Sequence, residues 1–487
     1  MNLTKEQLYE LKKQGKYNIA PVSTEMLSDI RTPVEVLKIL LNADAHCYML
    51  ESAADSETWG RYTFLGYEPK LEITCVNGVI KSGGETVETD RPDIYLRELL
   101  AKYKSPKIEG LPTFTGGLVG YFSYDFLKYA EPSLRLDAKD TEGFKDFDLM
   151  LFDKVIAFDN YRQKMILIAN ISLDDIDGEY ERAKNELAAI EQLIRHGKPI
   201  ENTRGKMTSD IKPLFSEEQF CDMVTRAKHH IFEGDIFQIV LSNRLEADFE
   251  GSLLDTYRIL RTLNPSPYMF YFSGSDMEVA GASPETLVKL EDGVLHTFPL
   301  AGTRPRGKTA QEDERLKAEL LADEKELAEH NMLVDLGRND IGKISKFGSV
   351  TVERYHEVLP YSHVMHIGST VRGDIRDDCD AIDAINAILP AGTLSGAPKI
   401  KACQLINDLE NNKRGIYGGA IGYIDFTGNL DTCIAIRIAY KKNGKVFIRS
   451  GAGIVADSVP ENEYKETLNK AAAVVGALKA AQNGLDR

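Results

Sequence analysis

A glutamate on the apolar face of a predicted helix is the first residue in this sequence that could do chemistry. Leu333 and Leu336 follow Glu329 at the i+4 and i+7 positions, so helical spacing places the three side chains on one face. A carboxylate on a buried face must pair with a cation, because desolvating it alone costs too much free energy. Two partners stay open: an arginine in a structural salt bridge, or a metal ion.

A second glutamate lies near the start of the last predicted helix. Asn469, Lys470 and Ala473 share the face of Glu466, at i+3, i+4 and i+7. A solvent-exposed Glu–Lys pair explains this spacing by itself. Magnesium prefers one or two carboxylates together with water and substrate oxygens, which Glu329 and Glu466 could supply. Spacing alone does not show that the two side chains meet.

Three glycine-bearing turns in the second half could bind an anion. Residues 301–307 (AGTRPRG), 392–399 (GTLSGAPK) and 450–453 (SGAG) each let backbone N–H groups approach a negative charge closely. None matches the phosphate-loop or dinucleotide pattern, and a glycine turn alone often serves chain geometry only. Arg437 lies in a predicted apolar strand, where it suits either bidentate capture of a carboxylate or an internal ion pair.

Histidine and nucleophile patterns narrow the chemistry further. His363 and His366 are three residues apart on one predicted strand, so their side chains point to opposite faces. At most one of them can line a given pocket. A single strand histidine is also compatible with a structural role. The sequence has no nucleophile-elbow serine or cysteine motif and no zinc-protease motif, so we predict neither a hydrolase nucleophile nor a zinc site.

The elements that must position these residues predict a mixed α+β protein with large antiparallel sheets packed with helices. The polar segment 196–213 reads as a surface linker, which divides the chain into regions 1–200 and 214–482. Ser216 begins a capping box and opens a helix. Strands and helices follow in hairpin-like groups rather than as a βαβ repeat. Predicted strands include 155–158, 165–169, 236–245, 268–272, 278–282, 419–425, 432–440 and 446–450, and predicted helices 180–195, 313–335, 398–410 and 462–482.

Composition excludes several classes of protein. The 487 residues carry a formal net charge of −16, which argues against nucleic acid or an anionic membrane as the main partner, although a local basic pocket can still bind a small anion. The six cysteines are widely spaced without a C-x-x-C pair, as expected for thiols in a reducing compartment. Neither a signal peptide nor a membrane-spanning run is visible, so we expect a cytoplasmic protein.

Taken together, several segments resemble the chorismate-utilising enzymes, and most closely the large subunits of anthranilate synthases. In the second half the matching segments are 264–270 (NPSPYMF), 282–285 (ASPE), 299–307 (PLAGTRPRG), 329–340 (EHNMLVDLGRND), 392–399, 417–422 (YGGAIG), 431–437 (DTCIAIR) and 451–470. They cover nearly all of this half in the family's order. Residues 49–52 (MLES) and 61–69 match more loosely in the first half. The resemblance implies the family's fold of two intertwined subdomains.

The resemblance also implies a reaction and a set of site residues. Ammonia adds to C2 of chorismate, the C4 hydroxyl leaves, and pyruvate is eliminated to give anthranilate. By the family's pattern, Glu329 and Glu466 hold Mg²⁺, Glu285 is the general acid, and His366 lies near the ring for pyruvate elimination. Chorismate-binding residues carried over in the same way are Gly302, Thr303, Tyr417, Arg437, Gly451, Ala452 and Gly453.

Two positions help to choose among relatives. Family members that add water carry a lysine base where this chain has Gln238, and a glutamine cannot deprotonate water. Aminodeoxychorismate synthases typically carry a lysine where this chain has Ala301. Anthranilate is therefore the expected product, with an aminodeoxychorismate synthase of the folate pathway as the alternative. A non-catalytic amino-acid sensor with this fold is a further alternative, which the intact set of site residues disfavours.

The first region resembles a regulatory domain that binds L-tryptophan, the end product of the pathway. Ser52 matches the family's inhibitor-site serine, and Pro267, Tyr268 and Met269 would complete the pocket. A strand turn without a ligand is the alternative for this segment. The chain has no glutamine-amidotransferase cysteine motif, so the resemblance implies a separate subunit that supplies ammonia, in a heterodimer or heterotetramer.

Overall fold

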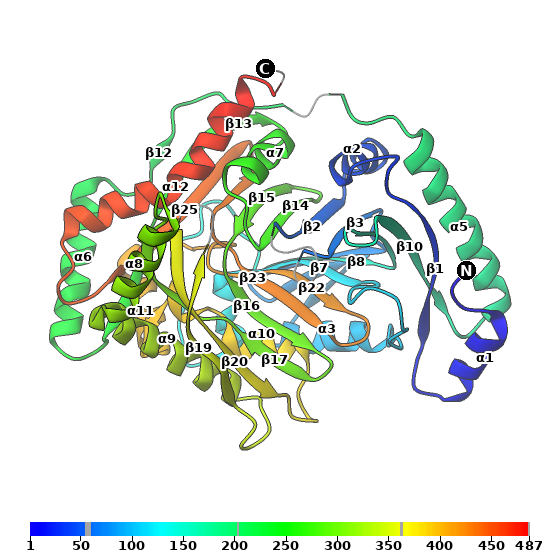
Figure 1. Cartoon of the computed structure of the whole chain (residues 1–487), viewed down its shortest axis with the longest axis horizontal. Helices are drawn as coiled ribbons and strands as arrows, with labels where there is room; N and C mark the ends of the chain where they lie inside the picture. Colours follow the sequence, from blue (N-terminus) through cyan, green and yellow to red (C-terminus); the bar gives the residue numbers. More distant parts are fainter. Residues whose placement is uncertain (54–59, 202–203, 361–363, 486–487) are drawn as a thin grey trace.

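The computed structural model describes residues 1–53, 60–201, 204–360 and 364–485, and it is an α+β structure built on two large antiparallel sheets (Figure 1). Sheet A, as we name the first, has the order β1 (Ile19–Leu27), β10 (Lys164–Ser172), β9 (Lys154–Asp159), β3 (Tyr62–Tyr67), β2 (Cys47–Glu51), β14 (Tyr268–Ser273), β15 (Met277–Ser283), β24 (Ile438–Lys442), β25 (Lys445–Ile454), β13 (Gln238–Gly251) and β11 (Gly205–Met207), and β12 (Lys212–Pro213) and β21 (Gly396–Ala397) also pair with β13.

The second sheet, sheet B, follows the same antiparallel pattern. Its order is β18 (Leu300–Pro305), β20 (Val364–Asp374), β17 (Val294–Thr297), β16 (Thr286–Glu291), β23 (Leu430–Ile434), β22 (Ala420–Asp425), β7 (Gly117–Phe122), β8 (Phe147–Phe152), β4 (Leu71–Val76), β5 (Val79–Ser82) and β6 (Glu85–Glu88), with β19 (Thr351–Pro360) paired to β20. An aromatic core lies between the sheets, where Tyr48 and Phe270 of sheet A pack with Tyr121 and Tyr423 of sheet B.

Both sheets take strands from both halves of the chain. In sheet A the halves meet where β14 pairs with β2, with Tyr271 opposite Met49. In sheet B they meet where β22 pairs with β7, with Gly422 opposite Gly120. This sharing explains the intertwined architecture that the family resemblance implied. The predicted regions 1–200 and 214–482 therefore do not form separate sheets, and their assignment as regulatory and catalytic stays a prediction.

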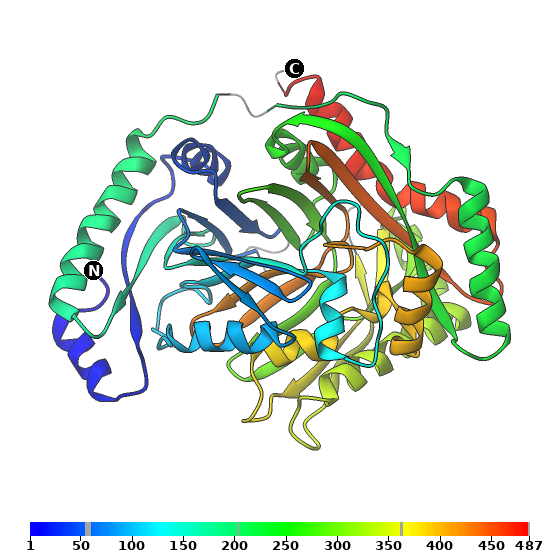
Figure 2. The same cartoon turned by 180° about the vertical axis from the view of Figure 1, so that it is seen from behind.

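Helices cover the outer faces of the two sheets. On sheet A, α2 (Pro33–Ala43), α5 (Ile176–His196), α7 (Leu254–Leu263) and α12 (Pro460–Gln482) bury one apolar core, and α5 and α12 lie at opposite ends of the molecule (Figure 2). On sheet B, α3 (Pro92–Ala101), α9 (Glu324–Gly342) and α10 (Ala381–Ile388) bury another. In the described part of the chain, no helix is long and apolar enough to cross a membrane.

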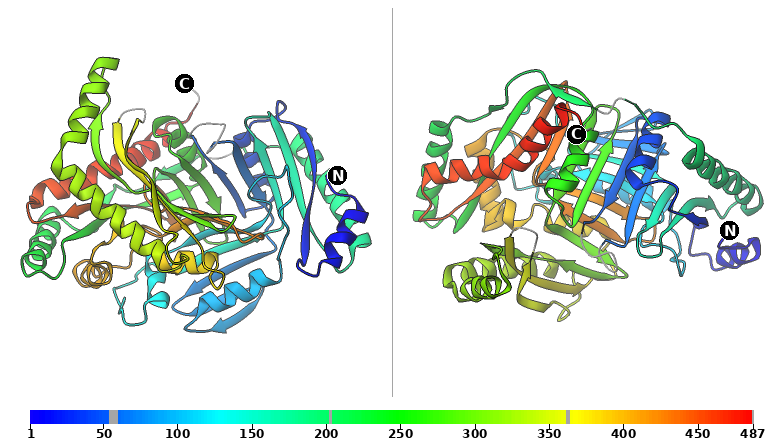
Figure 3. Two further views of the ribbon diagram at one scale, coloured as in Figure 1. Left: turned by 60° about the horizontal axis from the view of Figure 1, so that its bottom comes forward. Right: turned by 45° about the horizontal axis from the view of Figure 1, so that its top comes forward.

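The remaining helices include several that flank the site. The capping box at Ser216 is present and begins α6 (Glu217–Phe232), which packs with α11 (Lys399–Glu410) against β13 and β25. Short helices are α1 (Lys5–Lys13), α4 (Leu127–Ala130), η1 (Tyr124–Phe126) and η2 (Gly392–Leu394). Together with α9, α8 (Ala310–Ala322) lies beside β18 and β20 at one edge of sheet B (Figure 3).

Four sequence predictions need correction here. The predicted helix over 313–335 is two helices, α8 and α9, because the side chain of Asp323 caps the start of α9. The predicted strand over 432–440 breaks into β23 and β24, since Arg437 adopts a left-handed backbone with φ +54°. Pro398 is the N-cap of α11 rather than its first residue. The predicted linker 196–213 contains β11 and β12, and the six cysteines are free thiols as expected.

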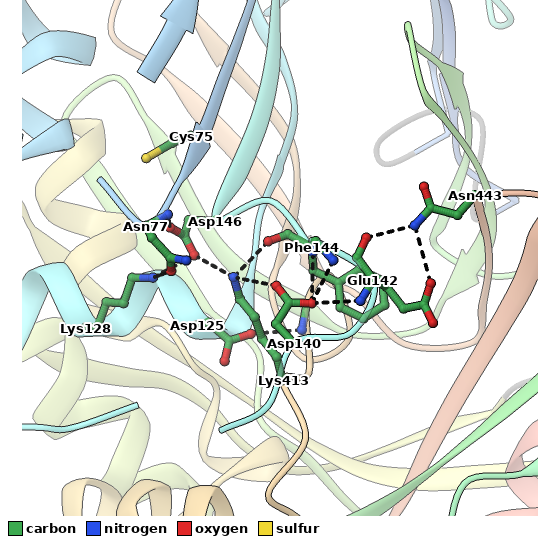
Figure 4. Close-up of polar contacts among 12 residues, drawn as sticks. Cys75, Asn77, Asp125, Lys128, Asp140, Glu142, Phe144, Asp146, Lys413 and Asn443 are labelled. Carbon is green, nitrogen blue, oxygen red and sulfur yellow. Dashed lines mark hydrogen bonds and ion pairs between the residues drawn. The ribbon is translucent and has the colours of Figure 1, made fainter. Parts of the chain in front are cut away.

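A buried ionic cluster joins residues from the two halves of the chain (Figure 4). The Lys413 ammonium, after α11, donates to the Phe144 carbonyl at 2.8 Å and lies 3.1 Å from Asp146 and 3.5 Å from Asp140. Lys128 donates to the same Asp146 carboxylate at 2.9 Å. Because Lys413 and Asp146 are both buried, this cluster fixes the segment after α11 against β8.

Candidate active site

Two strands cross from one sheet to the other at the same place, and each crossing carries a predicted site residue. Glu285 lies between β15 of sheet A and β16 of sheet B, and Arg437 lies between β23 of sheet B and β24 of sheet A. The two crossings are bonded together, because the Ile434 N–H donates to the Glu285 carbonyl at 2.9 Å and the Ala282 N–H to the Arg437 carbonyl at 3.2 Å. The left-handed backbone of Arg437 is therefore part of a crossing, rather than of a continuous strand.

The Glu285 carboxyl group has the protonation range of a general acid. Burial raises its pKa to about 7, against the opposing effects of a Thr393 hydrogen bond and of the Arg437 and Lys470 charges. The Thr393 hydroxyl donates to Oε1 of Glu285 at 3.0 Å from helix η2. A carboxyl with this pKa is substantially protonated at neutral pH, so it can give a proton to a leaving group.

His366, Gly302 and Thr303 meet on neighbouring strands of sheet B. Thr303 on β18 is the register partner of His366 on β20. Nδ1 of His366 lies 3.1 Å from the Gly302 carbonyl and 3.0 Å from the Thr303 hydroxyl. Because a carbonyl only accepts, Nδ1 carries the proton and Nε2 carries the lone pair of the neutral ring. Burial lowers the pKa of His366, as does Arg437, so the neutral form dominates. His363 lies outside the described residues.

Tyr417 and the segment 451–453 form a further part of the candidate site. Gly451, Ala452 and Gly453 lie on β25, and the Tyr417 hydroxyl lies 2.9 Å from the point where a Cβ on Gly451 would be. Any side chain at residue 451 would therefore displace this hydroxyl. Burial raises the pKa of Tyr417 to about 12, so its hydroxyl stays a donor. Ala452 is fully buried, which leaves only its backbone for a ligand.

Lys470 links the segment 451–453 to the predicted metal ligands. Its ammonium donates to the Gly451 carbonyl at 3.1 Å and lies 2.6 Å from Glu466 on the same helix, α12. Its charge also lowers the pKa values of Glu285 and of Glu329 on α9. The structure therefore brings together residues of both helices that are more than a hundred positions apart in sequence.

Glu329 does not lie on a buried apolar face, contrary to the prediction from helical spacing. Glu329 is solvent-exposed, and of the two leucines only Leu333 is buried. Nearby protein atoms still desolvate the Glu329 carboxylate in part, and this raises its pKa. The charges of Glu326 and Glu466 raise this pKa further. Glu329 and Glu466 are thus electrostatic neighbours, which spacing could not establish.

The charges around Glu329 and Glu466 fit a divalent cation. Desolvation raises the pKa of Glu329, the charges of Glu326 and Glu466 raise it further, and a dication would relieve this repulsion. Within the described residues, no group of three or more acidic, histidine or cysteine side chains is close enough to hold a metal ion. A hard cation held here would therefore use one or two glutamates and complete its shell with water and substrate oxygens.

Sequence reasoning missed two glutamates of this cluster. Glu326 lies one turn before Glu329 on α9, and its carboxylate is 3.3 Å from the Cβ position of Gly302. Glu463 lies one turn before Glu466 on α12, and burial and then the Glu466 charge raise its pKa. The available signal was the repeated Glu-x-x-Glu spacing on two helices, since residues three apart share a face.

A separate cavity of about 780 Å³ lies on the other side of the strand crossing. All four residues predicted to bind an inhibitor line it, namely Ser52, Pro267, Tyr268 and Met269. None of the residues predicted to bind chorismate, metal or protons is among its lining residues in the described part of the chain. The structure thus separates the two predicted groups into two places.

The cavity and the candidate active site share one strand. Pro284 and Thr286 line the cavity, whereas Glu285 between them bonds to Thr393 on the other side. Successive residues of extended backbone point to opposite faces, which explains this division. The Tyr268 hydroxyl lies 2.9 Å from Thr286 Oγ1 and donates to Asp431 at 2.9 Å, so the cavity wall is bonded to the crossing strand.

Comparison with known proteins places this arrangement in a family. The family model for chorismate binding enzymes matches residues 45–476. Anthranilate synthase component 1 of Aquifex aeolicus is 44% identical over 492 residues, with 99% of each chain covered. The protein of the same name from Acetivibrio thermocellus is 43% identical over 493 residues, covering 97% of this chain and 98% of its own. The chain belongs to the anthranilate synthase component 1 family of chorismate-binding enzymes.

Solved structures agree with this membership. Anthranilate synthase component I from Streptococcus pneumoniae superimposes with a TM-score of 0.78 at 38% identity, covering 92% of this chain and 98% of that one. The menaquinone-specific isochorismate synthase of Escherichia coli has the same fold, with a TM-score of 0.71 at 18% identity, covering 98% of this chain and 100% of that one. The predicted family and fold are therefore confirmed.

The residue expected to separate ammonia-using from water-using family members lies within the site. Gln238 begins β13, is buried, and its Nε2 is 3.2 Å from the Cβ position of Gly453. Among the described residues, its Oε1 has no hydrogen-bond partner. A glutamine in this place of the candidate site has no basic nitrogen with which to activate water.

Proposed function

We propose that the chain is a carbon–oxygen lyase that converts chorismate and ammonia to anthranilate, pyruvate and water. The observation that carries the proposal is the strand crossing, where a carboxyl of pKa about 7, Glu285, lies within electrostatic reach of Arg437 and Lys470. This arrangement suits a dianionic substrate that must lose hydroxide, a poor leaving group. Membership of the anthranilate synthase component 1 family supports the same assignment.

Substrate binding falls to groups around the crossing. The Arg437 guanidinium offers two parallel donors to one carboxylate, and the Tyr417 hydroxyl and the backbone of Gly451–Gly453 offer further donors. Gly302 and Thr303 would add contacts from β18, where Thr303 is bonded to His366. These groups would hold the ring in one orientation, which supplies part of the rate acceleration.

Glu329 and Glu466 are the residues that would hold Mg²⁺, with Glu326 and Glu463 one helical turn away from them. When bound, the ion would neutralise and orient the ring carboxylate of the substrate. Lys470 bonds to Glu466 and so keeps that carboxylate on the side of the cluster that faces Gly451.

Two protein groups then move protons. As ammonia forms its bond to C2, both ring double bonds shift and Glu285 would give its proton to the departing C4 hydroxyl, which leaves as water. The new ammonium group would then return one proton to the Glu285 carboxylate and become the neutral amine. In the second stage the neutral Nε2 of His366 would accept the C2 proton, while the bond between C3 and the enolpyruvyl oxygen breaks. The enolpyruvate that leaves would take up a proton at its methylene carbon, from the His366 imidazolium or from solvent, and become pyruvate. The His366 ring is held for this step by Gly302 and Thr303 through Nδ1.

The ammonia would come from a glutamine amidotransferase subunit, component II, in a heterodimer or heterotetramer in the cytoplasm. The family name, component 1, supports a second component. This chain lacks a glutaminase cysteine motif, and its own groups account only for chorismate chemistry. Free ammonium at raised pH would replace the partner, because un-ionised ammonia is the nucleophile.

The cavity on the other side of the crossing would bind L-tryptophan as a feedback inhibitor. Ser52, Pro267, Tyr268 and Met269 line it, and its volume of about 780 Å³ accommodates an indole with its amino-acid group. Pro284, Glu285 and Thr286 are consecutive. A ligand that pushed on Pro284 or Thr286 would therefore turn the Glu285 side chain away from Thr393. Inhibition would therefore act on the proton donor without blocking the substrate site.

Product analysis tests the proposal. Purified chain with chorismate, Mg²⁺ and ammonium should form fluorescent anthranilate, and mass spectrometry should find pyruvate in equal amount. An amine product that retains the enolpyruvyl group would instead identify an aminodeoxychorismate synthase. If the chain bound tryptophan but formed no amine product, it would be a sensor, and the enzyme assignment would be wrong.

A further inference from the structure

A buried arginine outside the predicted site contacts three of the segments that build it. Arg414 lies four residues after the end of α11, and Arg414, Glu410 and Arg449 are 4%, 2% and 4% exposed. Two arginines and one glutamate leave an excess positive charge in the interior, which is costly unless every donor is paired. None of the three belongs to the predicted binding or catalytic set.

The donors of Arg414 reach α11, η2 and β13. Nε and Nη2 donate to the two Glu410 oxygens at 3.0 Å and 2.6 Å. Nη1 donates to the Leu394 carbonyl at 2.7 Å, and Nη2 also donates to the Val240 carbonyl at 2.7 Å. Leu394 directly follows Thr393, the donor to Glu285, and Val240 is the register partner of Gly453.

The same guanidinium approaches the substrate-facing tyrosine. Its central carbon lies 5.8 Å from the ring centroid of Tyr417 and 4.6 Å from that of Tyr124. The Tyr417 hydroxyl in turn lies against Gly451. Arg414 therefore contacts the η2 segment, the strand opposite Gly453 and the ring of Tyr417 with one rigid planar group.

Glu410 and Arg449 complete the network on the side of β13. Arg449 donates to Glu410 at 2.9 Å and to the Ser242 hydroxyl at 2.8 Å. The Ser242 N–H and hydroxyl donate to Glu410 at 2.8 Å and 3.0 Å, and Ser242 is the register partner of Gly451. Burial acts to raise the pKa of Glu410, but Arg414 and Arg449 outweigh it and hold this pKa below its ordinary value, so the network stays ionised.

We propose that Arg414 is a positioning residue for the reaction, which holds Thr393 against Glu285 and aligns Tyr417 with the Gly451–Gly453 strand. The inference rests on the proposed function, since it gives Glu285 the part of proton donor. A lysine could keep the charge, but a single ammonium cannot span Glu410, Leu394 and Val240 in one plane. The alternative is a purely structural network, which would affect folding and nothing else.

The pH dependence of turnover separates these two roles. Glu285 must be protonated to act, so turnover falls as pH rises through its pKa of about 7. The Thr393 hydrogen bond favours the charged form of Glu285, and Arg437 and Lys470 also face this carboxyl and favour its charge. Weakening only the Thr393 bond raises the pKa of Glu285, so the basic limb of the kcat profile moves to higher pH.

The experiment compares Arg414→Lys with Lys413→Arg in the full-length chain, using chorismate, Mg²⁺ and enough ammonium to keep un-ionised ammonia saturating at every pH. Lys413 is the matched control, because it is adjacent and buried but bonds to the carboxylate cluster of Figure 4. We expect Arg414→Lys to lower kcat by ~10²-fold and to shift the basic limb of the kcat–pH profile to higher pH by roughly one unit. Lys413→Arg should lower Tm and leave kcat and the basic limb unchanged.

Thr393→Val gives an independent arm. It removes only the hydroxyl that bonds to Glu285. It should shift the basic limb of the kcat–pH profile to higher pH by the same amount as Arg414→Lys. The double variant should show no further shift, because Arg414 acts through Thr393. If Arg414→Lys fails to fold, Glu410→Gln loosens the same guanidinium and is measured in its place.

The outcomes are distinct. A variant of Arg414 or Glu410 with a lower Tm but an unshifted basic limb and unchanged kcat would overturn the positioning role. If the basic limb moves additively in the double variant, Arg414 does not act through Thr393 and the proposal also fails. The wild-type chain is measured first: absence of anthranilate would overturn the proposed function, and this inference with it, before any variant is compared.

Discussion

The candidate active site and the large cavity lie on opposite sides of one strand crossing, yet they are built from different materials. The active site gathers charged groups, such as Glu285, Arg437 and Lys470, from the second half of the chain. The cavity draws on both halves, and its predicted ligand-binding residues are uncharged, as with Ser52 and Tyr268. Charged side chains of both signs, such as Lys289 and Asp431, also line the cavity, but its four predicted ligand-binding residues are not among them.

Because the two places share one strand, a ligand bound at one would lie close to the groups of the other. Pro284 and Thr286 face the cavity while Glu285 faces Thr393, so three consecutive residues belong to both places. A change on one face of this strand can therefore be felt on the other, although neither ligand would touch both. Substitutions that damage one side and spare the other test whether the two places are separate in function.

The largest effect is expected at the metal ligands. Glu329→Gln removes one of two carboxylates that would hold Mg²⁺, and we expect kcat/KM to fall about 10³-fold with a weaker apparent affinity for Mg²⁺. Tryptophan binding, measured by calorimetry, should not change, because Glu329 is not a lining residue of the cavity. Glu324→Gln, an exposed glutamate on the first turn of the same helix, is the matched control and should leave both unchanged. Equal losses in the two variants would contradict the metal assignment.

Next in size is the proton donor. Glu285→Gln should lower kcat roughly 10²- to 10³-fold, since a carboxamide cannot protonate a leaving hydroxyl. In the wild-type chain the fall of kcat with rising pH should be centred near the pKa of about 7 that burial gives Glu285. The residual activity of the variant should lack this basic limb. A basic limb that survives in Glu285→Gln would assign the proton to another group.

The sequence predicted these two sides unequally. Motif resemblance located Glu285, Arg437 and Ser52, because family patterns record which residues meet in space. Periodicity placed the helices but assigned Arg437 to a continuous strand, since a left-handed backbone at a residue other than glycine has no compositional signal. The same reasoning put Glu329 on a buried face, which requires knowing what packs against α9.

The network around Arg414 shows where sequence reasoning ends. Glu410 and Arg414 are four apart, a spacing that usually marks an exposed ion pair on a helix. Their burial, and the bonds of Arg414 to Val240 and Leu394, depend on strands from distant parts of the chain. Asp323 is a different case, because an aspartate before a helical run is a readable N-cap, and its signal was available.

A moderate effect confined to the cavity is expected from Ser52. Ser52→Ala should weaken inhibition by tryptophan about tenfold, the equivalent of one hydrogen bond of ~1.4 kcal/mol, and leave the uninhibited kcat within about twofold. Steady-state inhibition curves measure both quantities. Ser275→Ala, at an exposed position between β14 and β15, is the control and should leave inhibition unchanged. If Ser52→Ala lowered kcat as strongly as it weakened inhibition, the two places would not be separable.

The smallest effect is expected from Asp431, a cavity carboxylate that accepts a hydrogen bond from Tyr268. Burial raises the pKa of Asp431 to about 6, so its charge appears as pH rises through that value. The ammonium group of tryptophan stays protonated over this range, and a negative cavity wall attracts it, so binding should strengthen about threefold between pH 5 and pH 7.5. Asp431→Asn should flatten this dependence while kcat in the absence of tryptophan stays close to wild type. Binding that instead weakens as Asp431 ionises would mean that the carboxylate end of the amino acid, rather than its ammonium, faces this wall, and it would reverse the orientation of the ligand between the two sheets.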